Sequence, residues 1–103
     1  MSSFNWIGTV PACANEDTLT TILRNEWGFQ GMVITDYDGS YGYMITDHCV
    51  RTGNDLMLGF SSQASNQLTN TESATLNNAL RTSCKNIMYT IANSGYYTNT
   101  TDD

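Results

Sequence analysis

The sequence has few basic residues, one proline and one histidine. Its 103 residues include four lysine or arginine residues against ten acidic ones, so the formal net charge is -6. The four are scattered rather than clustered: Arg24, Arg51, Arg81 and Lys85. Binding to nucleic acid is therefore not expected, because the neutralisation of phosphates needs a basic face.

Long apolar runs are also missing. No run has the length of a membrane span, and the N-terminus as given has neither the basic segment nor the apolar stretch of a secretion signal. We therefore expect no interaction with a membrane and no signal peptide or transmembrane segment in this chain. The sequence leaves the cellular compartment unknown.

Histidine and cysteine are too few for the usual metal and thiol sites. Cys13, Cys49 and Cys84 are far apart in the sequence, form no Cys-x-x-Cys pair and are odd in number, so free thiols are expected. A zinc site or a Ser-His or Cys-His dyad would need His48, which lies in a polar helical turn with nothing nearby to orient it. No metal site and no cofactor are predicted.

The clearest positive signal is the stretch from Gly31 to Ser40. Three apolar residues follow a Gly-Phe-Gln-Gly turn and lead directly to Asp36, which predicts a buried parallel strand that ends in a carboxylate. Ligands of α/β folds bind at the carboxyl ends of parallel strands, so Asp36 is a candidate catalytic group. The alternative is a turn residue that closes the strand, because Asp-x-Asp-Gly is also a common turn sequence.

The predicted elements follow in the order strand, helix, strand, helix, strand, helix. They lie at residues 1–5, 16–27, 31–36, 46–52 and 55–59, and the last helix runs from a capping box at Thr69 and Glu72 to Gly95. Residues 8–14 and 60–71 are expected to be loops, and 96–103 a polar tail. Two apolar stripes at helical spacing are assigned to the core: Leu19, Ile22, Leu23 and Trp27, then Leu76, Leu80, Cys84, Ile87, Met88 and Ile91.

Strands that alternate with helices indicate an α/β fold with a parallel sheet. A complete (β/α)8 barrel takes roughly 250 residues, so the chain supplies a partial TIM barrel of about three parallel βα units. Such a sheet has open edges. We therefore expect association with a complementary barrel fragment or self-association.

The stretch from Leu19 to Tyr37 carries a specific likeness, with the core Trp-Gly-Phe-x-Gly-x-Val-x-x-Asp ending at Asp36. It resembles the C-terminal part of the N-terminal catalytic barrel domain of glycoside hydrolase family 3. Residues 1–5, 51–58 and 85–94 are similar to further segments of that domain, in the same order. The resemblance covers residues 1–95 and implies that the chain begins inside a domain.

The resemblance implies a β-glucosidase-like enzyme that hydrolyses terminal β-linked sugars with retention, through a covalent glycosyl-Asp intermediate. Its substrate would be a β-glycoside or an oligosaccharide, and its nucleophile would be Asp36. A retaining mechanism also needs a second carboxyl about 5 Å away, and in the family that acid/base residue lies outside this region. Asp38 is interpreted as a turn residue. Ser3, Asn5 and Tyr37 are candidate substrate-binding residues.

The sequence also departs from the family, which commonly has Arg at the position of Trp6 and Trp at that of Tyr37. Two alternatives follow from the residues. The chain could be a non-catalytic remnant that binds sugar or associates with a partner. Alternatively, Val33 to Ser40 resembles the motif of haloacid-dehalogenase-like phosphatases, in which Asp36 would be the nucleophile, Asp38 the acid/base and Mg²⁺ the cofactor.

Overall fold

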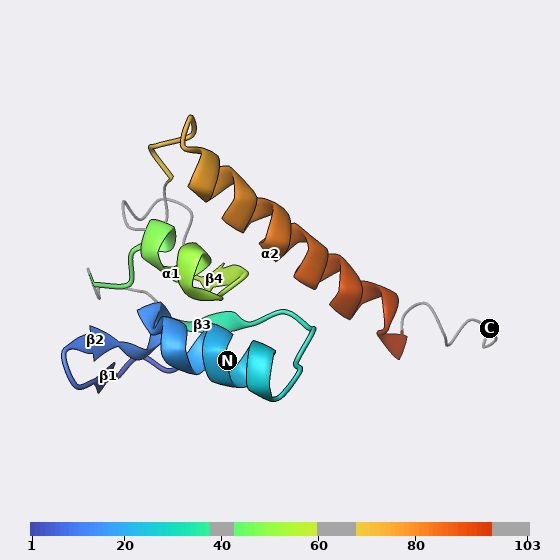
Figure 1. Cartoon of the computed structure of the whole chain (residues 1–103), viewed down its shortest axis with the longest axis horizontal. Helices are drawn as coiled ribbons and strands as arrows, with labels where there is room; N and C mark the ends of the chain where they lie inside the picture. Colours follow the sequence, from blue (N-terminus) through green and yellow to red (C-terminus); the bar gives the residue numbers. More distant parts are fainter. Residues whose placement is uncertain (38–42, 60–67, 96–103) are drawn as a thin grey trace.

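Two parallel strands form the centre of this computed structural model, which describes residues 1–37, 43–59 and 68–95 (Figure 1). Strand β3 (Ile34–Tyr37) pairs with β4 (Leu56–Leu58), and Ile34 lies opposite Leu56. On the other side of β3, Ser2 forms a parallel bridge with Thr35. Three extended segments therefore lie side by side in chain order, as predicted. The partial TIM barrel remains a prediction.

The N-terminal segment contains a hairpin that the sequence analysis missed. Strands β1 (Trp6–Ile7) and β2 (Val10–Pro11) pair antiparallel, and a short 3-10 helix, η1 (Ala12–Ala14), follows. Gly8 has a φ of +64° in the two-residue turn. A positive φ suits tight hairpin turns, whose twist then matches that of the strands. The prediction of a plain loop over residues 8–14 was therefore wrong.

The first predicted helix is present as η2 (Asp17–Glu26), but it is a π-helix. The amide of Trp27 donates to the carbonyl of Ile22, five residues earlier, at 2.9 Å. The Asn15 side chain accepts a hydrogen bond from the amide of Thr18 at 2.9 Å, which confirms the predicted cap. Residues at α-helical spacing do not share one face of the wider π-helix, and Ile22 is 36% exposed. Trp27, which was also assigned to the core, lies just beyond the end of η2 and is 74% exposed.

Helix α1 (Thr46–Thr52) has the predicted bounds, and Gly53 ends it with a φ of +128°. Helix α2 (Ala74–Ala92) begins later than predicted. Its cap is Ser73, whose hydroxyl accepts from the amide of Leu76 at 3.3 Å, so the predicted capping box was wrong. The helix also ends before Gly95.

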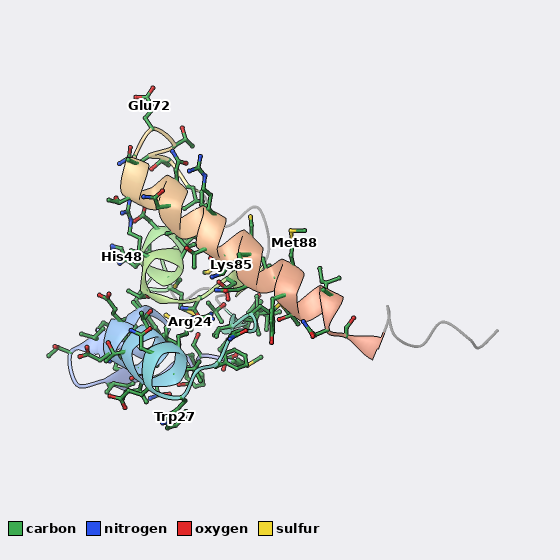
Figure 2. The ribbon with its side chains drawn as sticks, turned by 45° about the vertical axis from the view of Figure 1, so that its right-hand side comes forward. Arg24, Trp27, His48, Glu72, Lys85 and Met88 are labelled. Atoms are coloured by element: carbon green, nitrogen blue, oxygen red, sulfur yellow. The ribbon has the colours of Figure 1, made fainter. Side chains whose placement is uncertain are left out.

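The apolar stripe assigned to the core on α2 is largely on the outside. Leu76 is buried and Leu80 and Ile87 are half-buried, but Cys84, Met88 and Ile91 are exposed. Figure 2 shows Met88 pointing away from the body of the protein. The inner face of α2 instead carries polar side chains that bond to the rest of the fold: Ser83, Asn86 and Thr90.

Three parts of the predicted organisation lie outside the described residues: Asp38, most of the loop at 60–71, and the tail at 96–103. Within residues 1–37, 43–59 and 68–95, no helix combines the length and the apolar character that crossing a bilayer requires.

Candidate functional site

Asp36 lies at the third position of β3, next to the carboxyl end of the strand. Its side chain is half-buried, and one carboxylate oxygen, Oδ1, accepts a hydrogen bond of 2.7 Å from the amide of Tyr37. The structure therefore confirms that a parallel strand delivers a carboxylate to its carboxyl end. The bond to the following amide also fits the turn-residue interpretation, so it does not decide between the two.

The backbone of Asp36 is fixed by its neighbour. Thr35 is completely buried, and its hydroxyl donates to the carbonyl of Asp36 at 2.8 Å while it accepts from the amide of Leu58 at 3.0 Å. One side chain thus joins the ends of β3 and β4. Because both strand ends are held, the position of Asp36 is set by the sheet.

The three candidate substrate-binding residues are exposed, and they lie in different surroundings. Tyr37 ends β3 next to Asp36 and is 43% exposed. Asn5 donates from its side chain to the carbonyl of Trp6 at 3.3 Å. Ser3 lines a cavity of about 430 Å³ between the N-terminal segment and η2, and Asp36 is not among the residues that line it.

Sequence reasoning missed an aromatic pair near this end of the sheet. The hydroxyl of Tyr43 donates to the carbonyl of Phe4 at 2.5 Å, and its ring lies 5.2 Å from that of Trp6, tilted by 48°. Ser2 is bridged to Thr35, and Phe4 and Tyr37 each lie two residues further along their segments. Both residues are therefore at the carboxyl ends of the parallel segments. The signal available in the sequence was the cluster of tyrosines at positions 37, 41 and 43, to which no role was assigned.

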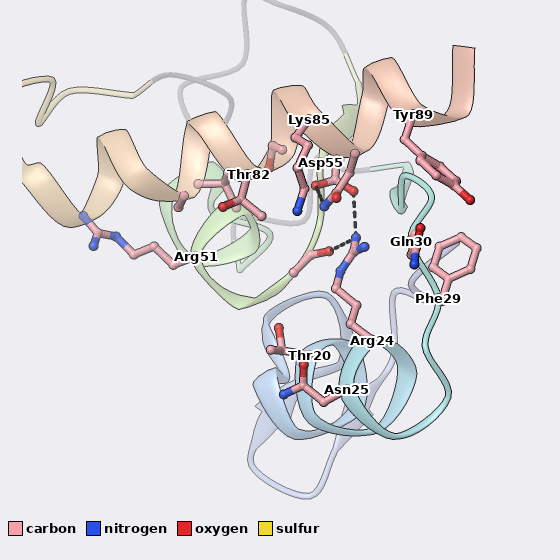
Figure 3. A pocket seen from close by; sticks show the side chains of 15 residues that line it. Thr20, Arg24, Asn25, Phe29, Gln30, Arg51, Asp55, Thr82, Lys85 and Tyr89 are labelled. Atoms are coloured by element: carbon pink, nitrogen blue, oxygen red, sulfur yellow. Dashed lines mark hydrogen bonds and ion pairs between the residues drawn. The ribbon is translucent and has the colours of Figure 1, made fainter. Parts of the chain in front are cut away.

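A larger cavity lies elsewhere, between η2 and α2 (Figure 3). Its volume is about 640 Å³, and its lining includes Asp55, which directly precedes β4. It is therefore at the amino ends of the strands, opposite to Asp36. In parallel α/β folds that end serves stability rather than catalysis.

A buried ion pair dominates this cavity. Asp55 accepts from Nη2 of Arg24 at 2.8 Å, from the amide of Val33 at 2.8 Å and from the Asn86 side chain at 3.1 Å. Arg24 also donates to the carbonyls of Gly31 and Gly53, each at 2.9 Å. Figure 3 shows Arg24 reaching from η2 toward Asp55 in the segment before β4, and Asn86 approaches Asp55 from α2. The cluster ties three elements together.

The part of the chain that the structure describes contains no group of three or more His, Cys, Asp and Glu side chains suited to a metal ion. The phosphatase interpretation requires Asp38 as well as Asp36, and Asp38 lies outside the described residues.

Comparison with known proteins relates the chain to glycosidases. No family model matches it. It is 34% identical over 56 residues to a protein of Aspergillus flavus named probable beta-glucosidase I, and 39% identical over 56 residues to a beta-glucosidase of Rhizobium radiobacter. Each match covers 54% of this chain and 6% of the relative. A probable beta-glucosidase J of Aspergillus fumigatus is 42% identical over 41 residues, which are 40% of this chain and 5% of the relative.

These similarities establish a glycoside hydrolase-like relationship over about half of the chain. The matches span only about one twentieth of the length of these relatives.

Proposed function

We propose that this chain forms part of the catalytic barrel of a family 3 glycoside hydrolase, in which Asp36 is the nucleophile of retaining β-glycoside hydrolysis. The observation that carries the proposal is a carboxylate at the carboxyl end of a parallel strand, in a chain similar to proteins named beta-glucosidase. In barrel enzymes, catalytic residues come from this end of the strands.

The surroundings of Asp36 suit a nucleophile. The amide of Tyr37 bonds to Oδ1 and orients the carboxylate, and the other oxygen would attack the anomeric carbon. The glycosidic bond breaks as this C–O bond forms, and a second carboxyl donates a proton to the departing oxygen. Water then attacks the glycosyl-Asp ester, with the second carboxyl now acting as base, and the configuration is retained. The resemblance places that second carboxyl outside residues 1–95.

Aromatic rings on the segments at this end of the sheet support a sugar as the substrate. Trp6 and Tyr37 are 50% and 43% exposed, and the half-buried ring of Tyr43 packs against that of Trp6. Aromatic rings offer large apolar faces at small entropic cost, and the edges of Tyr and Trp also form hydrogen bonds. A terminal β-linked sugar presents both apolar C–H faces and hydroxyl groups, so these rings are the proposed wall of its site.

A second candidate is an association module without turnover of its own. Large apolar side chains are exposed on several elements, including Trp27 directly after η2, Leu56 and Leu58 on β4, and Met88 and Ile91 on α2. Among the described residues β4 pairs with β3 on one side, and an open strand edge is a template for pairing with another chain. The proposed occupant of these surfaces is the remainder of a catalytic barrel, and a second copy of this chain is the alternative.

A chimaera tests the enzymatic proposal. Residues 1–59 would replace the aligned segment of the Rhizobium radiobacter beta-glucosidase, and hydrolysis of an aryl β-glucoside would be measured. We expect the chimaera to turn over, and Asp36→Asn to lower kcat by about a thousandfold or more with little change in folding. The matched control is Asp17→Asn, an exposed aspartate on η2, which should retain activity. A folded Asp36→Asn chimaera with unchanged kcat would disprove the assignment.

A further inference from the structure

Two cysteines that are far apart in the sequence meet in one buried cluster. Cys13 in η1 and Cys49 in α1 are both completely buried, and Met44 completes the cluster. The segments that carry them pack against each other, so the contact follows from the docking of η1 on α1. The spacing of these two thiols in the sequence matches no known thiol motif, so the fold alone pairs them.

One side chain holds the backbone at both cysteines. The Asn54 amide group donates to the carbonyl of Cys13 and, at 3.2 Å, to that of Cys49. The hydroxyl of Thr52 donates to the carbonyl of His48 at 2.8 Å and lies near both cysteine carbonyls, at 3.4 Å and 3.2 Å. Ser2 in turn donates to the Asn54 side chain at 2.6 Å. The relative position of the two cysteine backbones is therefore fixed by a buried polar network.

The thiols themselves interact. A hydrogen bond from the Cys49 side chain lowers the pKa of the Cys13 thiol, and this outweighs the burial that raises it. A lower thiol pKa means a larger thiolate fraction, and the thiolate is the form that attacks a disulfide. Because both thiols are completely buried once η1 has docked on α1, this favours Cys13 as the sulfur that closes the bond inside the cluster.

We propose that Cys13 and Cys49 form a disulfide when the chain folds in the presence of a small-molecule disulfide oxidant. While the chain folds and the thiols are still open to solvent, the Cys49 thiolate attacks the oxidant, forms a mixed disulfide and releases one thiolate. As η1 docks on α1, the Cys13 thiolate then attacks the Cys49 sulfur and releases the second one. The two protein thiols are oxidised by two electrons, the oxidant is reduced to two thiols, and the protons of Cys13 and Cys49 end on those thiols.

The remaining cysteine, Cys84, is not expected to take part in this bond. Cys84 lies on the exposed side of α2, away from the cluster. Its oxidation would join two chains rather than close a loop. The inference does not depend on the proposed glycosidase function, because it rests on the fold around η1 and α1 alone.

The expected consequence is a more stable chain. A bond between Cys13 and Cys49 closes a loop that contains η2 and β3, and closing such a loop restricts the unfolded chain. For a domain of this size, we expect Tm to rise on the order of 10 °C relative to the reduced chain.

The test is to refold the full chain in a glutathione redox buffer, alkylate the free thiols in denaturant and digest with trypsin. Cleavage after Arg24, Arg51, Arg81 and Lys85 puts each cysteine in a different peptide: 1–24, 25–51 and 82–85. We expect a protein about 2 Da lighter, with one alkylated thiol, and a linked pair of peptides 1–24 and 25–51. Oxidation in guanidinium chloride is the control, where all three pairings should appear.

Single variants separate the proposal from its alternatives. Cys84→Ser should keep the link and the rise in Tm, whereas Cys13→Ser and Cys49→Ser should each abolish both. The proposal is overturned if links through Cys84 dominate in the redox buffer, or if peptides 1–24 and 25–51 are both alkylated. A chain without helical circular dichroism in that buffer would also overturn it, since the fold is what brings the two thiols together.

Discussion

Removal of the Asp55 carboxylate should be the most damaging single change at the amino ends of the strands. The side chain of Asp55 is 2% exposed and that of its partner Arg24 is 13% exposed. Asp55→Ala leaves a buried guanidinium unpaired and removes the acceptor of the Val33 amide and of the Asn86 side chain. The loss of one partner of a buried pair costs about 3–5 kcal/mol, which lowers the ratio of folded to unfolded chain by about a thousandfold.

The second ion pair of the described chain provides a matched control. Asp47 lies 2.5 Å from Nε of Arg51, one helical turn away on α1, and both side chains are 31% exposed. Pairs that remain accessible to solvent contribute about 0–1 kcal/mol. We therefore expect Asp47→Ala to shift the urea midpoint only slightly, when unfolding is followed by circular dichroism, whereas Asp55→Ala shifts it strongly.

The double variant Arg24→Met with Asp55→Ala tests the reason for the difference. It no longer contains an unpaired buried charge. Its loss in free energy of unfolding should therefore be clearly smaller than the sum of the losses of the two single variants. Equal midpoints for Asp47→Ala and Asp55→Ala, or strictly additive costs in the double variant, would refute the argument.

Three further substitutions test the packing. Gly53→Ala should cost about 2–3 kcal/mol, because its φ is +128° and the new Cβ would lie 2.9 Å from that of Leu19; urea denaturation measures this. Thr90→Val should cost about 1–2 kcal/mol by the same assay, since the Thr90 hydroxyl accepts from the amide of Met32 at 2.8 Å. Met88→Lys should change the free energy of unfolding by less than about 0.5 kcal/mol, because Met88 is 68% exposed.

The controls use the same chemistry in open surroundings. Gly8 also has a positive φ, but no atom lies within 4 Å of the Cβ that alanine would add. Gly8→Ala should therefore lower the free energy of unfolding by less than Gly53→Ala does. Thr82→Val removes only a bond to the carbonyl of Asn78 on the same helix and should be nearly neutral. If Thr82→Val destabilised the chain as much as Thr90→Val does, the role given to the α2 contacts would be contradicted. A large loss of stability for Met88→Lys would mean that the apolar stripe of α2 packs in the core after all.

The order of the parallel strands could be predicted from the sequence because local signals determined it. The apolar run before Asp36, the bounds of α1 with Gly53 at its end, and the strand after Asp55 agree with the structure. Each depends on residues next to one another in the chain.

The orientation of α2 could not be predicted, because long-range polar contacts decide it. Helical periodicity favoured the apolar stripe as the inner face, but Ser83 donates to the carbonyl of Asn54 and Asn86 donates to Asp55. These bonds join residues distant in the sequence, and buried polar groups must be paired. The same holds for Cys13 and Cys49, whose proximity depends on the docking of η1 on α1.

The most direct test of the central claim is to label the chimaeric beta-glucosidase with an activated 2-deoxy-2-fluoro β-glucoside and map the adduct. The reagent needs the nucleophile and little help from the acid, and the fluorine slows release of the ester. The account predicts one sugar per chain on peptide 25–51, with fragmentation placing it on Asp36. An adduct on a different carboxylate, or no adduct in a chimaera that still turns over, would contradict it.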